Sequence, residues 1–305
     1  MVARSLGVLD APAYEVLDHR FAPCIVPGGR AERLWTGGSW AEGPAWFDAG
    51  FLVWSDIPNN IMLRWDEPTN STSIYRHPTN GSNGNTIDRQ GRLITCETLT
   101  RRVTRTETTG QITILAEQFK GQRLKAPNDV VVKSDSTIWF TDPSYGGGAL
   151  AVGEREVTGC HVYRLDPLTG DLRQMTQDMV MPNGLAFSLD ERDLYVVDTG
   201  STNFENGPNH IRRFGLTDDH SLTGGEVFAE NAAKQFDGIR FDSEGRLWCA
   251  AEDGAHCYAN DGTLIGKIIL PERAANLGFG GREGETLFLT ATTSLYRVPI
   301  NVRRP

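Results

Sequence analysis

The 305-residue chain lacks several features that would point to particular classes of protein. Long amphipathic helical patterns are absent, which argues against a helical fold. No apolar stretch reaches the length of a bilayer span or of a signal-peptide core, so we expect a cytoplasmic protein without a membrane partner. The formal net charge is −9 and no basic stripe is present, which disfavours nucleic acid as a partner.

Residues that often carry chemistry are also scarce or badly spaced. The five cysteines are odd in number and lack zinc-finger spacing, so we expect free thiols. The six histidines show no paired spacing for a zinc site. No serine lies in a nucleophile-elbow context, which argues against a serine hydrolase. Any catalytic or metal site must therefore be sought in other residue types.

What the chain does contain is a short cassette that recurs six times. Each copy opens with Glu, Asn or Asp, and 14 or 15 residues later an apolar strand ends. A fixed internal register with variable spacing between copies is typical of a repeat architecture. The openings are EGPAWF (42–47), NGNTID (83–88), NDVVVK (128–133), NGLAFS (183–188), DGIRFD (237–242) and NLGFGG (276–281).

The cassettes predict an all-β fold, a six-bladed β-propeller with four strands per blade. Hairpin turns such as DRQG (88–91) and DSEG (242–245) join the first two strands, and two more short strands follow. The last cassette ends one strand short, so we expect ERLWTGG (32–38) to pair beside SLYRVPI (294–300) and close the last blade. The predicted propeller domain spans residues 31–305, after an N-terminal extension at 1–30.

Two long segments follow second strands, at 143–160 and 199–210. In a propeller, the turn after the second strand lies at the same end as the start of the first. We therefore expect both segments to border the mouth where the opening side chains lie.

The six opening side chains are two carboxylates and four amides, all of which offer hard oxygen atoms. Such a set suits Ca²⁺ or Mg²⁺, and an open ring favours calcium because calcium tolerates looser geometry. Asn and Asp before Gly are also common turn residues. Six in one register, each before an inner strand, favour a central cation site over six separate turns. The openers are Glu42, Asn83, Asn128, Asn183, Asp237 and Asn276.

At these residues the chain resembles the calcium-dependent gluconolactonase/regucalcin family, also called the senescence-marker-protein/luciferin-regenerating-enzyme group, and most closely its bacterial gluconolactonases. The resemblance covers about residues 30–300. The motifs that carry it are EGPAWF (42–47), SNGNTIDRQGRLITCE (82–97), RRVTR (101–105), APNDVVV (126–132), WFTDPSYG (139–146), MPNGLAFS (181–188) and FDGIRFDSEGRLW (236–248).

The resemblance implies a calcium-dependent hydrolase that opens small sugar lactones such as glucono-δ-lactone. It implies Glu42, Asn128, Asn183 and Asp237 as ligands of Ca²⁺ or another divalent cation, with Asp237 also transferring the proton. Asn276 is expected to face the cavity as a water or substrate contact. The expected substrate-binding residues are Asn83, Lys125, Asn128 and Tyr145.

Two positions depart from the family pattern. Thr98 lies where many bacterial members are expected to carry His, and Ala126, beside Lys125, lies where animal members carry Arg. Both departures concern substrate contacts, so they leave the identity of the lactone open.

Two alternative functions remain open from the sequence. A phosphotriesterase that hydrolyses organophosphates could use the same cation, since a divalent cation polarises P=O as well as C=O. A calcium-binding propeller without catalysis is the other alternative, because propellers host many functions.

Overall fold

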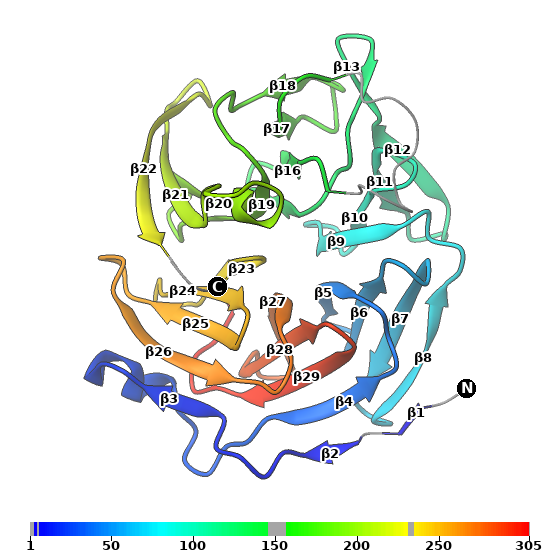
Figure 1. Ribbon diagram of the computed structural model, residues 1–305. Helices are drawn as coiled ribbons and strands as arrows, with labels where there is room; N and C mark the ends of the chain where they lie inside the picture. Colours follow the sequence, from blue (N-terminus) through cyan, green and yellow to red (C-terminus); the bar gives the residue numbers. More distant parts are fainter. Residues whose placement is uncertain (1–2, 5, 146–156, 231–234, 305) are drawn as a thin grey trace. The chain divides into compact units, whose positions relative to one another are not determined.

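The chain folds almost entirely into antiparallel strands (Figure 1). The computed structural model describes residues 3–4, 6–145, 157–230 and 235–304. The helices of this described part are two short 3₁₀ turns, η1 (His19–Cys24) and η3 (Gly200–Thr202). Six sheets of at least four strands form the six blades, so the predicted all-β, six-bladed propeller is confirmed.

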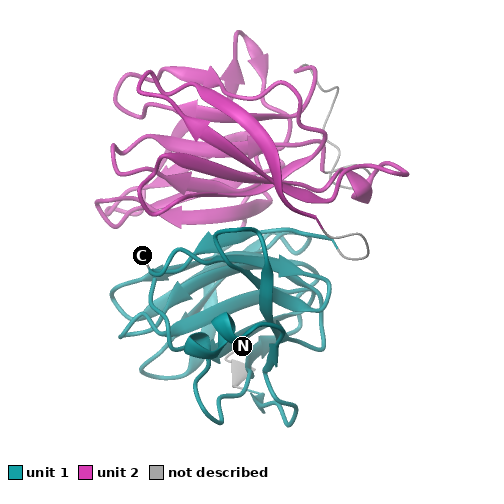
Figure 2. Cartoon of the chain, turned by 90° about the vertical axis from the view of Figure 1, so that its left-hand side faces the viewer, with its two compact units in different colours: residues 1–77, 231–305 teal, residues 78–230 magenta. Residues whose placement is uncertain are grey.

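Two compact units divide the chain, and each holds three blades (Figure 2). Unit 1 comprises residues 1–77 and 231–305, and unit 2 comprises residues 78–230. The predicted division at residue 30 stays a prediction.

Unit 1 contains the first, fifth and sixth blades. The first blade consists of β5 (Ala41–Phe47), β6 (Phe51–Asp56), β7 (Ile61–Asp66) and β8 (Ser71–Arg76). The fifth consists of β23 (Ile239–Phe241), β24 (Leu247–Ala251), β25 (Gly254–Tyr258) and β26 (Leu264–Ile269). The sixth consists of β27 (Ala274–Gly280), β28 (Thr286–Ala291), β29 (Ser294–Pro299) and β4 (Glu32–Thr36).

The sixth blade is closed by a strand from the other end of the chain. β4 pairs antiparallel with β29, with Thr36 opposite Ser294 and Glu32 opposite Arg297 (Figure 1). The predicted pairing of residues 32–38 with residues 294–300 is therefore confirmed. Closure supplies hydrogen-bond partners to an edge that would otherwise be open.

Residues before β4 add one further strand to each blade of unit 1. They form β1 (Ala3–Arg4), which pairs with β8, β2 (Gly7–Val8), which pairs with β4, and β3 (Tyr14–Val16), which pairs with β26. The N-terminal extension thus covers outer strand edges, a role that the sequence did not predict.

Unit 2 contains the second, third and fourth blades and a small extra hairpin. The second blade consists of β9 (Ser82–Ile87), β10 (Leu93–Glu97), β11 (Arg102–Thr106) and β12 (Ile112–Ala116). The hairpin consists of β13 (Gln118–Phe119) and β14 (Gln122–Arg123). The third blade consists of β15 (Val130–Val132), β16 (Ile138–Asp142), β17 (His161–Leu165) and β18 (Leu172–Gln174). The fourth consists of β19 (Pro182–Phe187), β20 (Asp193–Asp198), β21 (His210–Leu216) and β22 (Leu222–Glu230).

The predicted turns form by one repeated mechanism. In the β9–β10 turn, the Asp88 carboxylate accepts the N–H groups of Gln90 and Arg92, each at 2.9 Å. Gly91 in the same turn has φ +75°, a conformation that favours glycine. Asp242 accepts the N–H groups of Glu244 and Arg246 in the same way in the β23–β24 turn.

Large apolar side chains fill the space between neighbouring blades of each unit. The cluster shared by the first and sixth blades includes Leu34, Trp54, Trp65, Phe288 and Leu295, all at most 1% exposed. Burial of one such side chain stabilises the fold by roughly 1.5–3 kcal/mol. The five cysteines are free and buried.

The two long segments are only partly described. Residues 146–156 of the predicted loop at 143–160 lie outside the described residues, and η3 lies in the second segment. In the described part of the chain, no helix has the length and apolar character needed to cross a bilayer.

A substitution in the closing strand tests the role of blade closure. Leu34 of β4 is 1% exposed in the shared cluster, whereas Ile74 of β8 is 59% exposed. We expect Leu34→Ala to lower the free energy of unfolding by about 2–5 kcal/mol and Ile74→Ala by about 0.5 kcal/mol or less, measured by urea denaturation. Equal effects of the two variants would contradict the role assigned to β4.

Candidate active site

All six opening side chains lie at the beginning of an inner strand and are buried. Four lie on β5, β9, β19 and β27, and Asn128 and Asp237 lie two residues before β15 and β23 begin. Their exposed fractions range from 2% for Asn276 to 8% for Asn128. In four blades the strand pairing shifts register at the opener. Such bulges re-aim side chains, so the openers are part of the inner strands and not merely turn residues.

In unit 1 the openers of the three blades are neighbours. Asn276 Nδ2 donates to Glu42 Oε2 at 3.1 Å, and the N–H of Gly43 donates to the same oxygen at 3.1 Å. The side chain of Asn276 also lies against Gly238, where a Cβ atom would come within 2.1 Å of Asn276 Oδ1. A side chain at position 238 would therefore push Asn276 away, and Asn276 links Glu42 to the segment that carries Asp237.

Among the described residues, the hydrogen bonds of the Asn276 side chain lie within unit 1. Its Oδ1 accepts the N–H of Leu277 at 2.9 Å, its Nδ2 is bonded to Glu42, and the residue is 2% exposed. Both ends of the amide are thus used inside unit 1. Asn276 orients the Glu42 carboxylate, and its expected contact with water or substrate in the cavity stays a prediction.

In unit 2 the main chain at Asn128 is fixed from both sides. Its N–H donates to the Thr141 carbonyl at 2.9 Å, and its carbonyl accepts the N–H of Gly84 at 2.8 Å. A Cβ atom at Gly84 would lie 2.5 Å from that carbonyl, so the glycine after opener Asn83 permits the close approach of the second and third blades.

Asn183 is oriented by two hydroxyl groups. Its Nδ2 lies 3.3 Å from Thr199 Oγ1 and 3.4 Å from the Tyr145 hydroxyl. With the amide nitrogen engaged there, Oδ1 is the atom of Asn183 that is suited to a cation. Lys125 Nζ donates to Ser144 Oγ at 3.4 Å, next to Tyr145 in the chain. Unit 2 therefore brings the predicted substrate residues Lys125 and Tyr145 close to the segments of the openers.

Carboxylates at the ends of second strands fix the segments that precede three of the openers. Asp142, the last residue of β16, accepts the N–H groups of Lys125 and Ala126 at 2.9 and 2.6 Å. Asp198, the last residue of β20, accepts those of Val180 and Met181 at 2.9 and 2.7 Å.

The first blade repeats the same contact. Asp56, the last residue of β6, accepts the N–H groups of Ser39 and Trp40 at 3.2 and 3.3 Å. In every case the two donors lie three and two residues before the opener, which is Glu42, Asn128 or Asn183. We call this contact the carboxylate clamp of Asp56, Asp142 and Asp198.

The clamp gives these three carboxylates a structural role, because each holds the main chain before an opener. The second-blade counterpart, Glu97, is likewise occupied, since it accepts Arg102 Nε and Thr100 Oγ1 at 2.6 Å each. The proton-transfer role expected of Asp237 stays a prediction.

Thr98, one of the departures from the family pattern, also has a structural contact. Its hydroxyl donates to the Pro127 carbonyl at 3.1 Å, one residue before Asn128. Thr98 therefore helps to hold the segment of the third-blade opener.

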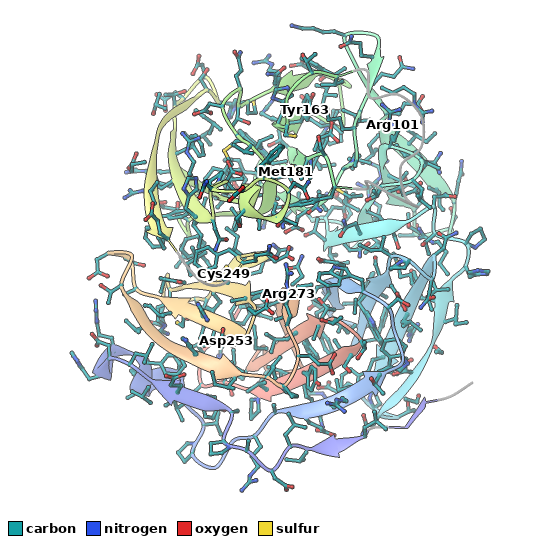
Figure 3. The ribbon with its side chains drawn as sticks, viewed as in Figure 1. Arg101, Tyr163, Met181, Cys249, Asp253 and Arg273 are labelled. Carbon is teal, nitrogen blue, oxygen red and sulfur yellow. The ribbon has the colours of Figure 1, made fainter. Side chains whose placement is uncertain are left out.

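Arg273 is a residue of the site that sequence reasoning missed (Figure 3). It directly precedes β27, and its Nη2 lies 3.7 Å from Asp237 Oδ2. Its guanidinium Cζ lies 5.1 Å from the centroid of the Trp40 ring. Arg273 lies three residues before opener Asn276, a spacing that could have marked it.

The donor set is compatible with a hard cation. No group of three or more His, Cys, Asp and Glu side chains suited to a metal occurs among the described residues. The predicted set instead combines two carboxylates with two amides, all buried and all offering oxygen. Glu42 and Asp237 belong to unit 1, whereas Asn128 and Asn183 belong to unit 2. Their joint coordination of one ion stays a prediction.

A separate cavity of about 470 Å³ lies at the other ends of the unit 1 strands. It is lined by the β5–β6 and β27–β28 turns and by Arg303 and Arg304, and it includes none of the openers. This cavity is therefore distinct from the candidate active site.

The chain was compared with known proteins. A family model described as the SMP-30/gluconolactonase/LRE-like region matches residues 40–293. A gluconolactonase of Zymomonas mobilis is 30% identical over 285 residues, which covers 85% of this chain and 78% of that protein. The structure of a gluconolactonase from Xanthomonas campestris aligns with a TM-score of 0.89 at 32% identity and covers 98% of each chain. A calcium-binding protein, regucalcin, from Agrobacterium tumefaciens aligns with a TM-score of 0.73 at 20% identity, covering 90% of this chain and 94% of that one.

The carboxylate clamp predicts a specific pH dependence of stability. Burial raises the pKa of Asp142 from 3.8 to about 6, although the N–H groups of Lys125 and Ala126 act in the opposite direction. In the unfolded chain the Asp142 carboxyl group loses its proton at a lower pH than in the folded protein. The free energy of unfolding should therefore fall as the pH rises from about 4 to 6. We expect Asp142→Asn to abolish up to about 3 kcal/mol of that fall.

The measurement is the free energy of unfolding of chelator-treated protein at pH 4, 5, 6 and 7. Asp218→Asn, which changes an exposed aspartate between β21 and β22, is the control and should leave the pH profile unchanged. Parallel profiles for wild type and Asp142→Asn would contradict the raised pKa.

Proposed function

The chain belongs to the SMP-30/gluconolactonase/LRE-like family, and we propose that it is a lactone hydrolase that depends on a divalent cation. The observation that carries the proposal is the family match over residues 40–293. The relatives from Zymomonas mobilis and Xanthomonas campestris are both named gluconolactonase, and the alignments to them cover most of this chain. The proposed substrate is a small sugar lactone such as glucono-δ-lactone.

The proposed cation is Ca²⁺, held by Glu42, Asn128, Asn183 and Asp237. The regucalcin from Agrobacterium tumefaciens is described as calcium-binding, but at 20% identity its likeness supports only the fold. The cation is therefore argued from the donors themselves. Two buried carboxylates balance the charge of a dication, and amide oxygens complete a set that calcium accepts more readily than a metal with strict octahedral geometry.

The polar contacts of unit 1 suggest different roles for its two acidic openers, Glu42 and Asp237. Glu42 is held by Asn276 Nδ2 and by the N–H of Gly43, which fixes its carboxylate as a ligand. Asp237 has a cationic neighbour instead, with Arg273 Nη2 at 3.7 Å from Oδ2. A nearby positive charge favours the ionised carboxylate, which is the form required of a general base.

We assign the proton transfer to Asp237. When bound, the divalent cation supplies Lewis-acid polarisation of the lactone carbonyl. Asp237 takes a proton from the water that attacks the carbonyl carbon, and then gives that proton to the ring oxygen as the ring C–O bond breaks. The product is the open-chain hydroxy acid.

The residues of unit 2 are assigned to substrate binding. Tyr145 and Lys125 offer a hydroxyl and an ammonium group for the hydroxyl groups of a sugar lactone. Asn128 and Asn183 act both as ligands and as orienting amides, and Asn83 is proposed as a further contact. No specific observation favours a phosphotriester substrate or a calcium-binding protein without catalysis. Lactone opening assayed with and without a chelator separates the non-catalytic alternative from an enzyme.

Two substitutions in unit 1 separate ligand from proton-transfer roles. Asp237→Asn keeps an oxygen ligand but removes the base, so we expect turnover to fall about 10²–10⁴-fold. Glu42→Ala removes a ligand oxygen, so it should mainly weaken cation binding. Turnover of glucono-δ-lactone is measured for both variants as a function of calcium concentration.

Saturating calcium should restore part of the activity of Glu42→Ala and none of that of Asp237→Asn. Recovery of Asp237→Asn to near wild-type turnover would show that Asp237 is a ligand only. Activity of the wild type that is unaffected by a chelator would contradict the dependence on a cation.

A further inference from the structure

Arg273 lies where the opener segments of all three blades of unit 1 meet (Figure 3). Its Nη2 is 3.7 Å from Oδ2 of Asp237, the opener of the fifth blade. Its guanidinium lies over the ring of Trp40, two residues before the opener of the first blade, with Cζ 5.1 Å from the ring centroid. Arg273 itself precedes Asn276, the opener of the sixth blade, by three residues.

The main chain holds Arg273 firmly in this place. The Arg273 carbonyl accepts the N–H of Thr292 at 3.0 Å. The preceding residue, Glu272, points into a different environment, where its carboxylate accepts Ser294 Oγ at 2.7 Å and the Tyr296 hydroxyl at 2.6 Å. With Glu272 anchored in this way and the Trp40 ring beneath the guanidinium, the cation is pre-oriented and little conformational entropy is lost when it binds a ligand.

The N–H donors of the Arg273 side chain make only long contacts with carboxylates of the described residues. Its contacts with Asp237 and Glu252 are 3.7 and 3.9 Å long, which exceeds hydrogen-bond distance. Its Nε is buried and has no hydrogen-bond partner there. The side chain is still 23% exposed, so a small ligand can reach it. A guanidinium group has five donors in a planar fork that matches the oxygens of carboxylate, phosphate or sulfonate.

We propose that Arg273 makes the enzyme selective for sugar lactones that carry an anionic oxygen-bearing substituent in addition to the lactone group. This inference rests on the proposed lactone hydrolase function. Asp237 is shared with the proposed dication, and the Glu252 carboxylate is 48% exposed and 3.9 Å away, so the positive charge of Arg273 is only partly compensated. An anionic substituent would pair with that charge and engage the free donors of the fork.

A substrate comparison tests the proposal directly. The probes are neutral glucono-δ-lactone, 6-phosphoglucono-δ-lactone and glucaro-δ-lactone, which differ in the additional substituent. Arg273→Gln should lower kcat/KM for at least one anionic lactone by about 10–100-fold, the loss expected for a charge-assisted hydrogen bond. The neutral lactone should also lose activity, because Arg273 neighbours Asp237, so the expected result is a fall of about 10-fold or more in the ratio of kcat/KM for the preferred anionic lactone to that for the neutral one. Comparison of 6-phosphoglucono-δ-lactone with glucaro-δ-lactone shows whether the Arg273 guanidinium prefers phosphate or carboxylate.

Arg282→Gln is the matched control for charge. Arg282 is an exposed residue of the β27–β28 turn in the same unit, so this substitution changes net charge equally without touching the opener segments. It should leave the preference between anionic and neutral lactones unchanged. Arg273→Lys keeps the charge but loses the fork, and it should restore only part of the preference.

A binding measurement supplies a readout that does not depend on turnover. Calorimetry on chelator-treated protein compares 6-phosphogluconate and glucarate, which carry a second anionic group, with gluconate, which does not. Arg273→Gln should weaken binding of the preferred doubly charged acid about 10-fold or more relative to gluconate.

Equal loss of kcat/KM for all three lactones in Arg273→Gln would overturn the proposal and leave Arg273 as a partner of Asp237 and Glu252. The same preference in wild type and Arg273→Gln would also overturn it, with the lactone hydrolase function intact. If the wild type opens none of the lactones, the proposed function itself fails.

Discussion

The carboxylate clamp is the interaction on which the arrangement of the site depends. In three blades an aspartate at the end of the second strand accepts the two main-chain N–H groups that lie three and two residues before the opener. A buried carboxylate is costly unless its hydrogen bonds are satisfied, so the carboxylate and the segment require each other. The clamp thereby fixes the backbone from which Glu42, Asn128 and Asn183 project. A displacement of that backbone would misplace a ligand oxygen, whose distance to a cation tolerates only a few tenths of an ångström.

In the fifth and sixth blades the segments that carry the openers are held without a carboxylate clamp. Their second strands end in Ala251 and Ala291, and the opener segments are held by direct contact between blades, with Asn276 packed on Gly238 and bonded to Glu42. Asp237 therefore has no clamp carboxylate at the end of the second strand of its own blade, and Arg273 Nη2 lies 3.7 Å from its Oδ2. The acid that we assign to proton transfer thus lies in the part of the repeat where the structural acid is missing and a cation is present. This asymmetry is a physical reason why one of six equivalent positions would differ in function from the others.

Much of the fold could be predicted from the sequence because its signals are local or periodic. The recurring cassette, the DRQG and DSEG turns and the missing last strand each depend on short-range patterns, and the blades, the turns and the β4–β29 pairing follow them. The site was less predictable because it depends on contacts between distant segments. The spacing of the cassettes makes Asn276 equivalent to Asn128. Only the structure shows that the amide of Asn276 donates to Glu42 and accepts the N–H of Leu277. Arg273 and Trp40 come together from opposite ends of the chain, and no pattern in the sequence links them.

We propose that the opener oxygens of four blades hold one divalent cation at which a lactone is hydrolysed. The most direct test is a crystal structure of the protein grown with calcium, in which the ion is identified by its anomalous scattering. We expect one strongly bound ion with oxygens of Glu42, Asn128, Asn183 and Asp237 at about 2.3–2.6 Å. An ion bound elsewhere, or no ion within reach of these four side chains at saturating calcium, would contradict it.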